Sequence, residues 1–185
     1  MIVDVEAQTG LRLFWGQKEN NRKALERQYA EIWEQFGAGL SRLAASYEAQ
    51  PPAREDLLQD IRMAIWLALP KFRSESSIRT FVFRIAHNRA LAHVWKRRDA
   101  ESIDELEIAD TAGDPEQATI AKLDSERLQS AIRTLPDPMK QVITLALEDI
   151  PYREIAEILG TTENNVAVRL NRARGLLRQK LGEMQ

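Results

Sequence analysis

The sequence predicts an all-α protein made of two small helical domains joined by an acidic linker. Apolar residues recur at three- and four-residue steps in segment after segment, which is the spacing of one face of an α-helix. In contrast, no run of β-branched and aromatic residues bounded by turn formers indicates a strand. The charges divide the chain, because residues 99–121 hold eight Asp or Glu and no Lys or Arg, whereas the flanking segments are mildly basic.

The first domain is predicted to span residues 21–98 as three helices. Leu25, Ile32 and Phe36 follow helical spacing, and Pro51 with Pro52 is expected to end the first helix because proline cannot continue one. Trp33 and Trp66 lie on the apolar stripes and are expected in the core, whereas residues 71–77 are polar, lack a period and predict a loop. Residues 1–20 carry no pattern that assigns them a role. The predicted helices cover about residues 21–47, 54–69 and 78–97.

The second domain is predicted to span residues 122–185 as four short helices. Breakers separate them at Leu135-Pro136, at Ile150-Pro151 and at Gly160-Thr161-Thr162. The acidic segment between the domains has little apolar periodicity and cannot fold alone, so it is expected to be a linker. We expect it to lie over the basic faces of the two domains. The predicted helices cover about residues 118–134, 137–148, 152–159 and 163–181.

Residues 152–170 carry the pattern of a helix-turn-helix. Such a motif needs a small residue where its helices touch, a glycine able to take a positive φ at the turn, and apolar residues that fix the second helix. Ala156, Gly160, Val166 and Leu170 meet these needs, and Thr162 is placed to cap the second helix. The alternative is an ordinary helical hairpin with a solvated basic face. Outward positions of the second helix that we expect to contact DNA are Asn164, Asn165, Ala167, Arg169, Asn171, Arg172, Arg174 and Arg178.

Several classes of protein are excluded by composition. The chain has no cysteine, so thiol catalysis, disulfides and cysteine-ligated zinc are absent. Its longest apolar run, Met63 to Leu69, is far shorter than the roughly 20 residues that span a bilayer, and it begins without a secretory signal. We therefore expect a cytoplasmic protein without membrane insertion. His87 and His93 lack a zinc-type spacing and are expected on the surface, and neither a cofactor nor an enzymatic activity is predicted.

Both domains resemble one family, the bacterial sigma factors of the extracytoplasmic-function (ECF) group within the sigma-70 family. Residues 135–174, which include the helix-turn-helix, resemble the region of these proteins that reads the −35 promoter element. The acidic segment 55–61 with Trp66 resembles the helix that binds the polymerase clamp, and residues 81–98 resemble the helix that reads the −10 element. The resemblance covers about Ala24–Arg98 and Leu128–Leu181, which is most of the chain.

The resemblance implies a subunit that brings core RNA polymerase to promoter DNA, with an anti-sigma protein as a further expected partner. Asp56, Gln59 and Asp60 would bind the polymerase core. Without the family, these three polar groups suggest a solvated face, an acid/base pair or a magnesium site. The resemblance also implies that the first domain is a promoter-melting domain. Its expected −10 contacts are Ser74, Ser76, Ser77, Arg84, Asn88, Arg89, Lys96 and Arg97.

Two positions depart from the family pattern. Ala92 stands where members commonly carry an aspartate, and Ala167 stands where they often carry a lysine. Two other functions remain open at this point: a helix-turn-helix regulator that binds duplex DNA alone, and an all-helical adaptor without a nucleic-acid role. A regulator would shift operator DNA by itself, whereas a sigma factor requires core polymerase.

Overall fold

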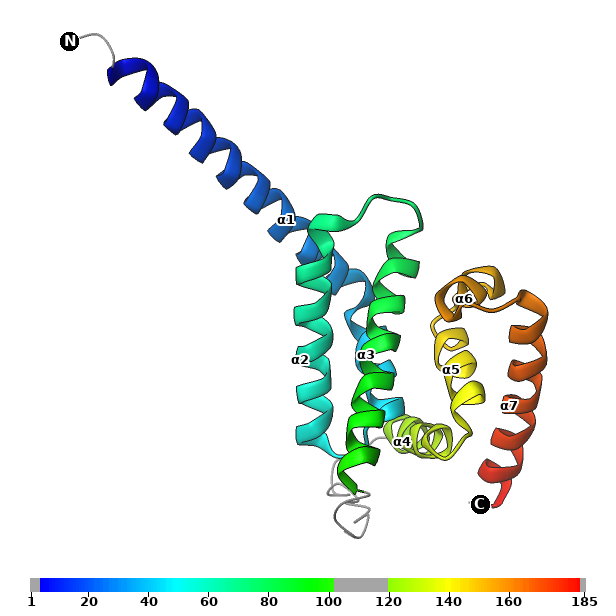
Figure 1. The fold of residues 1–185 in the computed structure, drawn as a ribbon. Helices are drawn as coiled ribbons and strands as arrows, with labels where there is room; N and C mark the ends of the chain where they lie inside the picture. Colours follow the sequence, from blue (N-terminus) through cyan, green and yellow to red (C-terminus); the bar gives the residue numbers. More distant parts are fainter. Residues whose placement is uncertain (1–3, 102–119, 184–185) are drawn as a thin grey trace.

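The computed structural model describes the backbone of residues 4–101 and 120–183 and the side chains of residues 19–98 and 123–182. Within these ranges the secondary structure is entirely helical, which confirms the all-α prediction. The helices form two groups that lie side by side (Figure 1). They are α1 (Asp4–Tyr47), α2 (Pro51–Ala68), the 3₁₀ turn η1 (Leu69–Lys71), α3 (Ile78–Glu101), α4 (Ile120–Arg133), α5 (Asp137–Ala146), α6 (Tyr152–Leu159) and α7 (Glu163–Glu183).

The carboxyl half of α1 packs with α2 and α3 around one core, as the apolar stripes predicted. Leu40, Leu57, Ile61 and Val82 are fully buried in it. The amino-terminal half of α1 projects away from the bundle (Figure 1). The helix begins at Asp4, well before the predicted start near residue 21, because a helix fixed by packing at one end extends without a new nucleus and needs no apolar stripe to do so.

The two prolines after α1 start the next helix, which corrects the expectation that they end the preceding one. α1 already ends at Tyr47, whereas Pro51 and Pro52 are the first residues of α2. Proline suits this position because the first turn of a helix needs no N–H donor and its fixed φ matches the helix. The second helix therefore begins three residues before the predicted start at Arg54.

Helices α4 to α7 enclose the core of the second group. Ile132, Leu145, Ile155 and Leu170 are completely buried, and α7 packs against each of the other three helices. α3 continues to Glu101 and α4 begins at Ile120, so most of the predicted acidic linker, residues 102–119, lies outside the described residues. The expectation that the linker lies over the basic faces of the two domains falls on these same residues, so it also lies outside the described part of the chain.

The two groups of helices contact each other directly. α1 packs on α4 and α5, and α3 packs on α6. The approach at Gly39 is close: a Cβ atom added there would lie 2.5 Å from Glu148 Oε2 and 3.1 Å from Phe83 Cζ. The Glu148 carboxylate is held by two hydrogen bonds from Arg42, at 2.6 and 2.8 Å. An alanine at this crossing would therefore require the Glu148 carboxylate or the Phe83 ring to move.

Candidate nucleic-acid interface

The turn between α6 and α7 has the geometry of a helix-turn-helix. Gly160 adopts the left-handed conformation, with φ 61° and ψ 40°, and its N–H closes α6 on the carbonyl of Ala156. Thr162 caps α7, since its Oγ1 accepts a hydrogen bond from the backbone N–H of Asn165 at 3.3 Å. Val166 and Leu170, which belong to α7, are fully buried. The predicted turn glycine, cap and apolar anchors thus all take the expected places.

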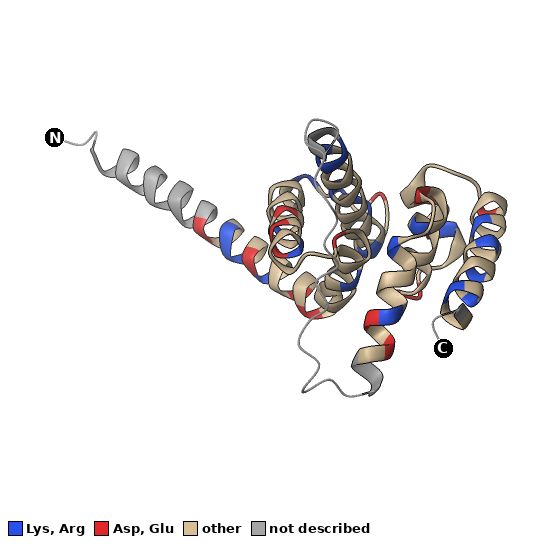
Figure 2. Cartoon of the chain, turned by 90° about the horizontal axis from the view of Figure 1, so that it is seen from below, with Lys and Arg blue, Asp and Glu red and all other residues tan. Residues whose placement is uncertain are grey.

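α7 lies on the side of the molecule away from α3 (Figure 1), and all of the predicted −35 residues belong to this helix. Basic residues follow its length (Figure 2). Ala167 and Arg169 are half-buried, so they lie at the edge of this face. Such a helix can enter a major groove, where Arg bonds guanine or phosphate and Asn bonds adenine. The exposed members of the predicted set are Asn164, Asn165, Asn171, Arg172, Arg174 and Arg178.

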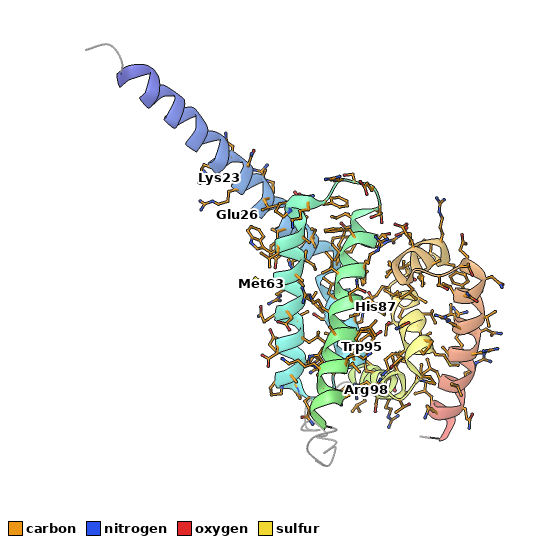
Figure 3. All side chains as sticks on the ribbon, viewed as in Figure 1. Lys23, Glu26, Met63, His87, Trp95 and Arg98 are labelled. Carbon is orange, nitrogen blue, oxygen red and sulfur yellow. The ribbon has the colours of Figure 1, made fainter. Side chains whose placement is uncertain are left out.

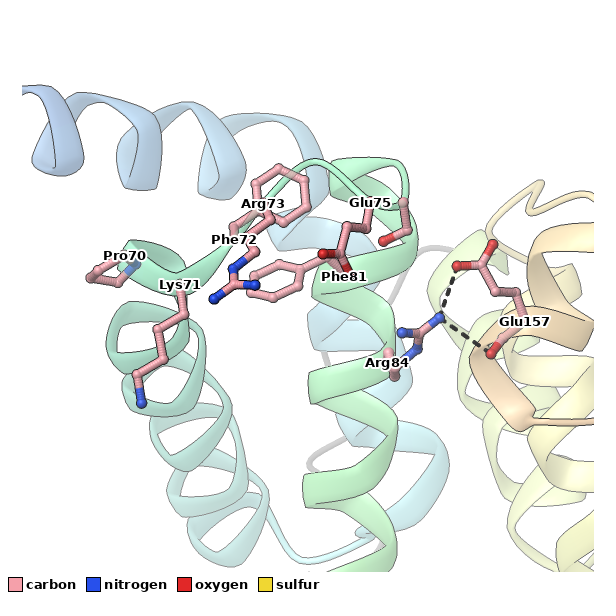
Figure 4. A pocket seen from close by; sticks show the side chains of 9 residues that line it. Pro70, Lys71, Phe72, Arg73, Glu75, Phe81, Arg84 and Glu157 are labelled. Carbon is pink, nitrogen blue, oxygen red and sulfur yellow. Dashed lines mark hydrogen bonds and ion pairs between the residues drawn. The ribbon is translucent and has the colours of Figure 1, made fainter.

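The loop between η1 and α3 forms one wall of a pocket of about 710 Å³ (Figure 4). Phe72 and Phe81 lie side by side in its wall with ring centroids 4.7 Å apart. Ser74 turns the loop with a φ of 57°, a conformation unusual for any residue but glycine. The wall also carries Lys71, Arg73, Glu75, Ser76 and Arg84. Aromatic faces beside cationic side chains are suited to stack a base and bind its phosphate.

The predicted −10 residues of α3 divide into exposed and engaged groups. Asn88, Arg89 and Lys96 are exposed on the helix. Ser77 precedes α3 and caps it, because its Oγ accepts a hydrogen bond from the N–H of Thr80 at 3.0 Å, while its hydroxyl donates to Glu154 of α6. Arg84 of α3 is also engaged: it donates to the side chain and the carbonyl of Glu157 at 2.9 and 3.3 Å.

Arg97, another predicted −10 residue, binds within its own domain. Its guanidinium donates to both oxygens of the buried Glu48, at 3.1 and 3.0 Å, and His93 Nε2 lies 2.9 Å from the same carboxylate. Burial acts to raise the pKa of Glu48, but hydrogen bonds from His93 and the Gln50 N–H, together with Arg97, outweigh burial and lower it. This cluster ties the end of α1 to the last turns of α3.

The expectation that both histidines lie on the surface is wrong. His93 is half-buried against Glu48, and His87 is 98% removed from solvent, with its Nδ1 3.3 Å from the Tyr47 hydroxyl. Burial lowers the pKa of His87 to about 4. Tyr47 in turn lies beneath the ammonium of Lys140 from α5, 5.7 Å from the ring centroid. His87 therefore belongs to a polar cluster at the joint between the two groups of helices.

The predicted polymerase contacts lie on a different helix from the DNA contacts. Asp56, Gln59 and Asp60 are exposed on α2. Met63 and Leu67 continue the same face at seven- and eleven-residue steps from Asp56 and are 59% and 64% exposed. Sequence reasoning missed these two apolar side chains by assigning residues 63–69 to an apolar run. Their helical register with the two aspartates would have revealed them.

A third exposed apolar side chain, Trp95, lies on α3 (Figure 3). It follows Asn88 by seven residues, so the two share one face of the helix. Across the described residues, no three His, Cys, Asp or Glu side chains gather as metal ligands would. Likewise, none of the helices in the described ranges combines the length and the apolar composition needed to cross a bilayer.

Two family models match the chain in the order of its two groups of helices. Sigma-70 region 2 matches residues 32–100 and sigma-70 region 4 matches residues 125–177. The first match covers α1 from residue 32 onward, α2 and nearly all of α3, and the second covers most of the α4–α7 bundle. A three-helix region 2 followed by a region 4 with its helix-turn-helix defines a sigma factor with two domains.

Curated relatives agree over nearly the whole chain. The RNA polymerase sigma factor YlaC of Bacillus subtilis is 31% identical over 87% of this chain and 94% of its own length. The sigma factor CnrH of Cupriavidus metallidurans is 30% identical over 82% of this chain, and the ECF sigma factor RpoE of Cereibacter sphaeroides is 28% identical over 84%. The chain belongs to the ECF group of the sigma-70 family and is an RNA polymerase sigma factor that initiates transcription at promoters.

Solved structures share the fold. RpoE of Bartonella quintana, solved with the anti-sigma factor NepR, has a TM-score of 0.70 at 26% identity and covers 83% of this chain and 95% of its own. CnrH, solved with the cytosolic domain of CnrY, has a TM-score of 0.65 at 24% identity and covers 86% and 91%. Members of this class are transcription initiation factors.

Proposed function

We propose that this sigma factor directs core polymerase to its promoters through three separate surfaces of the molecule. The exposed polar face of α7, fixed by the Gly160 turn, carries the proposal, because an anchored helix with a free basic face is what major-groove recognition requires. The division into a region 2 domain at residues 21–98, a linker at 99–121 and a region 4 domain at 122–185 belongs to the same proposal.

The α7 surface binds the −35 element. Asn164, Asn165 and Arg169 lie near the start of the helix, where a recognition helix meets base edges, and these residues select sequence. Arg174 and Arg178 lie further along and neutralise phosphates, which fixes the position of the helix without selecting sequence. Arg172 lies between the two groups. Ala167 packs against the groove without the charge that many family members carry there.

The loop and the exposed face of α3 bind the −10 strand. An unpaired base enters the pocket and stacks on Phe72 and Phe81, while Ser74 and Ser76 line the approach. Arg84, Asn88, Arg89 and Lys96 hold the backbone of the separated strand. Because Arg97 is fixed on Glu48, it contributes through the shape of α3 and the positive field beside the strand.

The α2 surface binds the polymerase core. Asp56 and Asp60 steer the encounter by charge, and Met63 with Leu67 supplies apolar area that a docked partner would bury. A mixed face of two acids and two large apolar side chains at helical spacing fits a basic helical partner surface. Gln59 lies between the acids and is held by Glu55 at 3.3 Å.

The structures of RpoE with NepR and of CnrH with CnrY support a further partner for this chain, an anti-sigma protein. Both neighbours align with most of the present chain, so the same two domains are available for such a partner. The proposed place of action is the cytoplasm, where the polymerase is found.

In vitro transcription with purified core polymerase over a library of genomic fragments tests the function. We expect defined start sites only when both the chain and the core enzyme are present. A stand-alone regulator would instead shift specific duplex DNA without polymerase and would support no transcription from it. Promoter-specific transcripts that are lost on replacing Arg172 and Asn165 together would assign α7 to the −35 element.

A further inference from the structure

One large apolar side chain, Val168, lies on the exposed face of α7. It is 42% exposed, whereas the core-facing side of the same helix carries Val166, Leu170, Ala173 and Leu177, all of them buried. Residues 166 and 170 each stand two positions from Val168, and positions two apart lie on nearly opposite sides of a helix with 3.6 residues per turn. The valine therefore faces solvent and does not belong to the core that fixes α7.

The surface neighbours of Val168 are residues proposed to bind the −35 element. Asn164 and Asn165 precede it by four and three residues, and Asn171 and Arg172 follow it by three and four. All four are exposed, and residues at these spacings are adjacent on the surface of a helix. Val168 thus occupies the centre of the polar face of α7, although the expectation from the sequence did not include it among the DNA contacts.

The position of this valine is held firmly. The first turn of α7 is fixed at Asn165, because its backbone N–H donates to Thr162 Oγ1 at 3.3 Å and its side-chain amide donates to Thr161 Oγ1 at 3.3 Å. Val168 follows by less than one turn, and a β-branched side chain in a helix has one strongly preferred rotamer. A contact made by Val168 therefore costs little side-chain entropy.

A valine can recognise only one feature of the major groove. Its side chain has no hydrogen-bond donor or acceptor, so it cannot pair with the polar edges of the bases. Covering such an edge without a hydrogen bond would cost free energy. The apolar group that the four bases present in this groove is the C5-methyl group of thymine. The chemistry of the exposed valine therefore indicates thymine.

We propose that Val168 selects a thymine in the −35 element through apolar contact with its C5-methyl group. The inference rests on the proposed function, in which α7 enters the major groove there. A helix rises 1.5 Å per residue, so Val168 lies about 4.5 Å along the axis from Asn165 and about 6 Å from Arg172. Successive bases of a strand are about 3.4 Å apart. The thymine therefore lies within about two base pairs of those next to Asn165 and Arg172.

Removal of single methyl groups from the DNA tests this contact. Promoters are first defined by transcription with core polymerase, and each −35 thymine of either strand is then replaced singly by deoxyuridine, which lacks only the methyl group. We expect parent holoenzyme to bind about three- to fourfold more weakly at one position, the effect of one buried methyl group. Holoenzyme with Val168→Ala should bind the thymine and deoxyuridine duplexes equally at that position.

Leu123→Ala is the matched control, because Leu123 is an apolar side chain of α4 with a similar exposure of 40%. Holoenzyme with this variant should keep the sensitivity of the parent to deoxyuridine. A −35 element without thymine, or a preference for thymine that persists unchanged in Val168→Ala, would overturn the proposal.

Restoring the methyl group on a different base gives a second test. At the sensitive position the thymine is replaced by cytosine or by 5-methylcytosine, which differ from each other only in the methyl group. We expect parent holoenzyme to bind the methylated duplex about three- to fourfold more tightly, and Val168→Ala to bind the two duplexes equally. An equal gain in both proteins would assign the methyl contact to another residue and overturn the proposal.

Arg172→Ala separates this inference from the proposed function. If Arg172→Ala and Val168→Ala both leave the affinity of holoenzyme for every duplex unchanged, α7 does not read the −35 element and the proposed function of this face fails. If Arg172→Ala weakens binding while no methyl group is sensed through Val168, α7 binds the −35 element and the inference about thymine alone is wrong.

Discussion

Acidification should destabilise this protein through His87. The folded chain holds this imidazole neutral with a pKa lowered to about 4 by burial, whereas in the unfolded chain it titrates near the ordinary value of 6.5. As the pH falls below 6.5, the His87 imidazole binds a proton in the unfolded chain but not in the folded chain, so the free energy of unfolding decreases. The loss is about 2 kcal/mol between pH 8 and pH 5 and approaches about 3 kcal/mol below the folded pKa.

The pH range of the stability loss distinguishes the contribution of His87 from those of the acids. Glu48 and Glu154 have lowered pKa values, so the stability they provide is lost only as the pH falls below the ordinary glutamate pKa of 4.5. Urea unfolding between pH 8 and pH 5 therefore isolates the imidazole.

His87→Gln is the test variant, and His93→Gln is the control, since the chain has two histidines. We expect the decline between pH 6.5 and pH 5 to flatten in the first variant and persist in the second. NMR titration should show the His87 imidazole neutral at pH 5. A ring that titrates near 6.5, or an unchanged slope in His87→Gln, would refute the argument.

Three further predictions concern the glycines and the two binding surfaces. Gly175→Ala should raise the free energy of unfolding by about 0.5–1 kcal/mol, because the added Cβ meets no atom within 4 Å and alanine favours a helix. Gly39→Ala should lower the free energy of unfolding by about 1–3 kcal/mol, because the added Cβ clashes with Glu148. Urea titration measures both variants, and equal effects would contradict the close approach at Gly39. Arg172→Ala should weaken −35 binding; a loss uniform over sequences, with a salt slope lower by about one, assigns a phosphate contact, and a loss at one base pair assigns guanine, while unchanged affinity rules out both. Asp56→Lys/Asp60→Lys should slow association with core polymerase, measured as binding to immobilised polymerase. The same variant should leave thermal unfolding of the free chain unchanged in calorimetry. Normal holoenzyme formation by this variant would show that α2 does not form the polymerase interface.

Local rules were sufficient for much of the molecule. The helix-turn-helix was predictable because the requirement for a left-handed residue at Gly160, the cap at Thr162 and the apolar spacing of Val166 and Leu170 all act within a few residues of the chain. The start of α1 at Asp4 was not predictable in this way, since it depends on extension from a packed end and leaves no stripe in the sequence.

The sequence by itself determined the helical class, the motif on α7 and the exposed acids of α2, because helical period and local conformation decide which side of a helix faces solvent. Only the tertiary structure decided which outward groups remain available. Arg97 donates a hydrogen bond to Glu48, which lies 49 residues away in the sequence, and Arg84 donates one to Glu157, which lies 73 residues away. His87 is buried because α1 supplies Tyr47 beside it. A period places a side chain on a face, but the partner that covers that face comes from elsewhere in the chain, and only packing brings the two together.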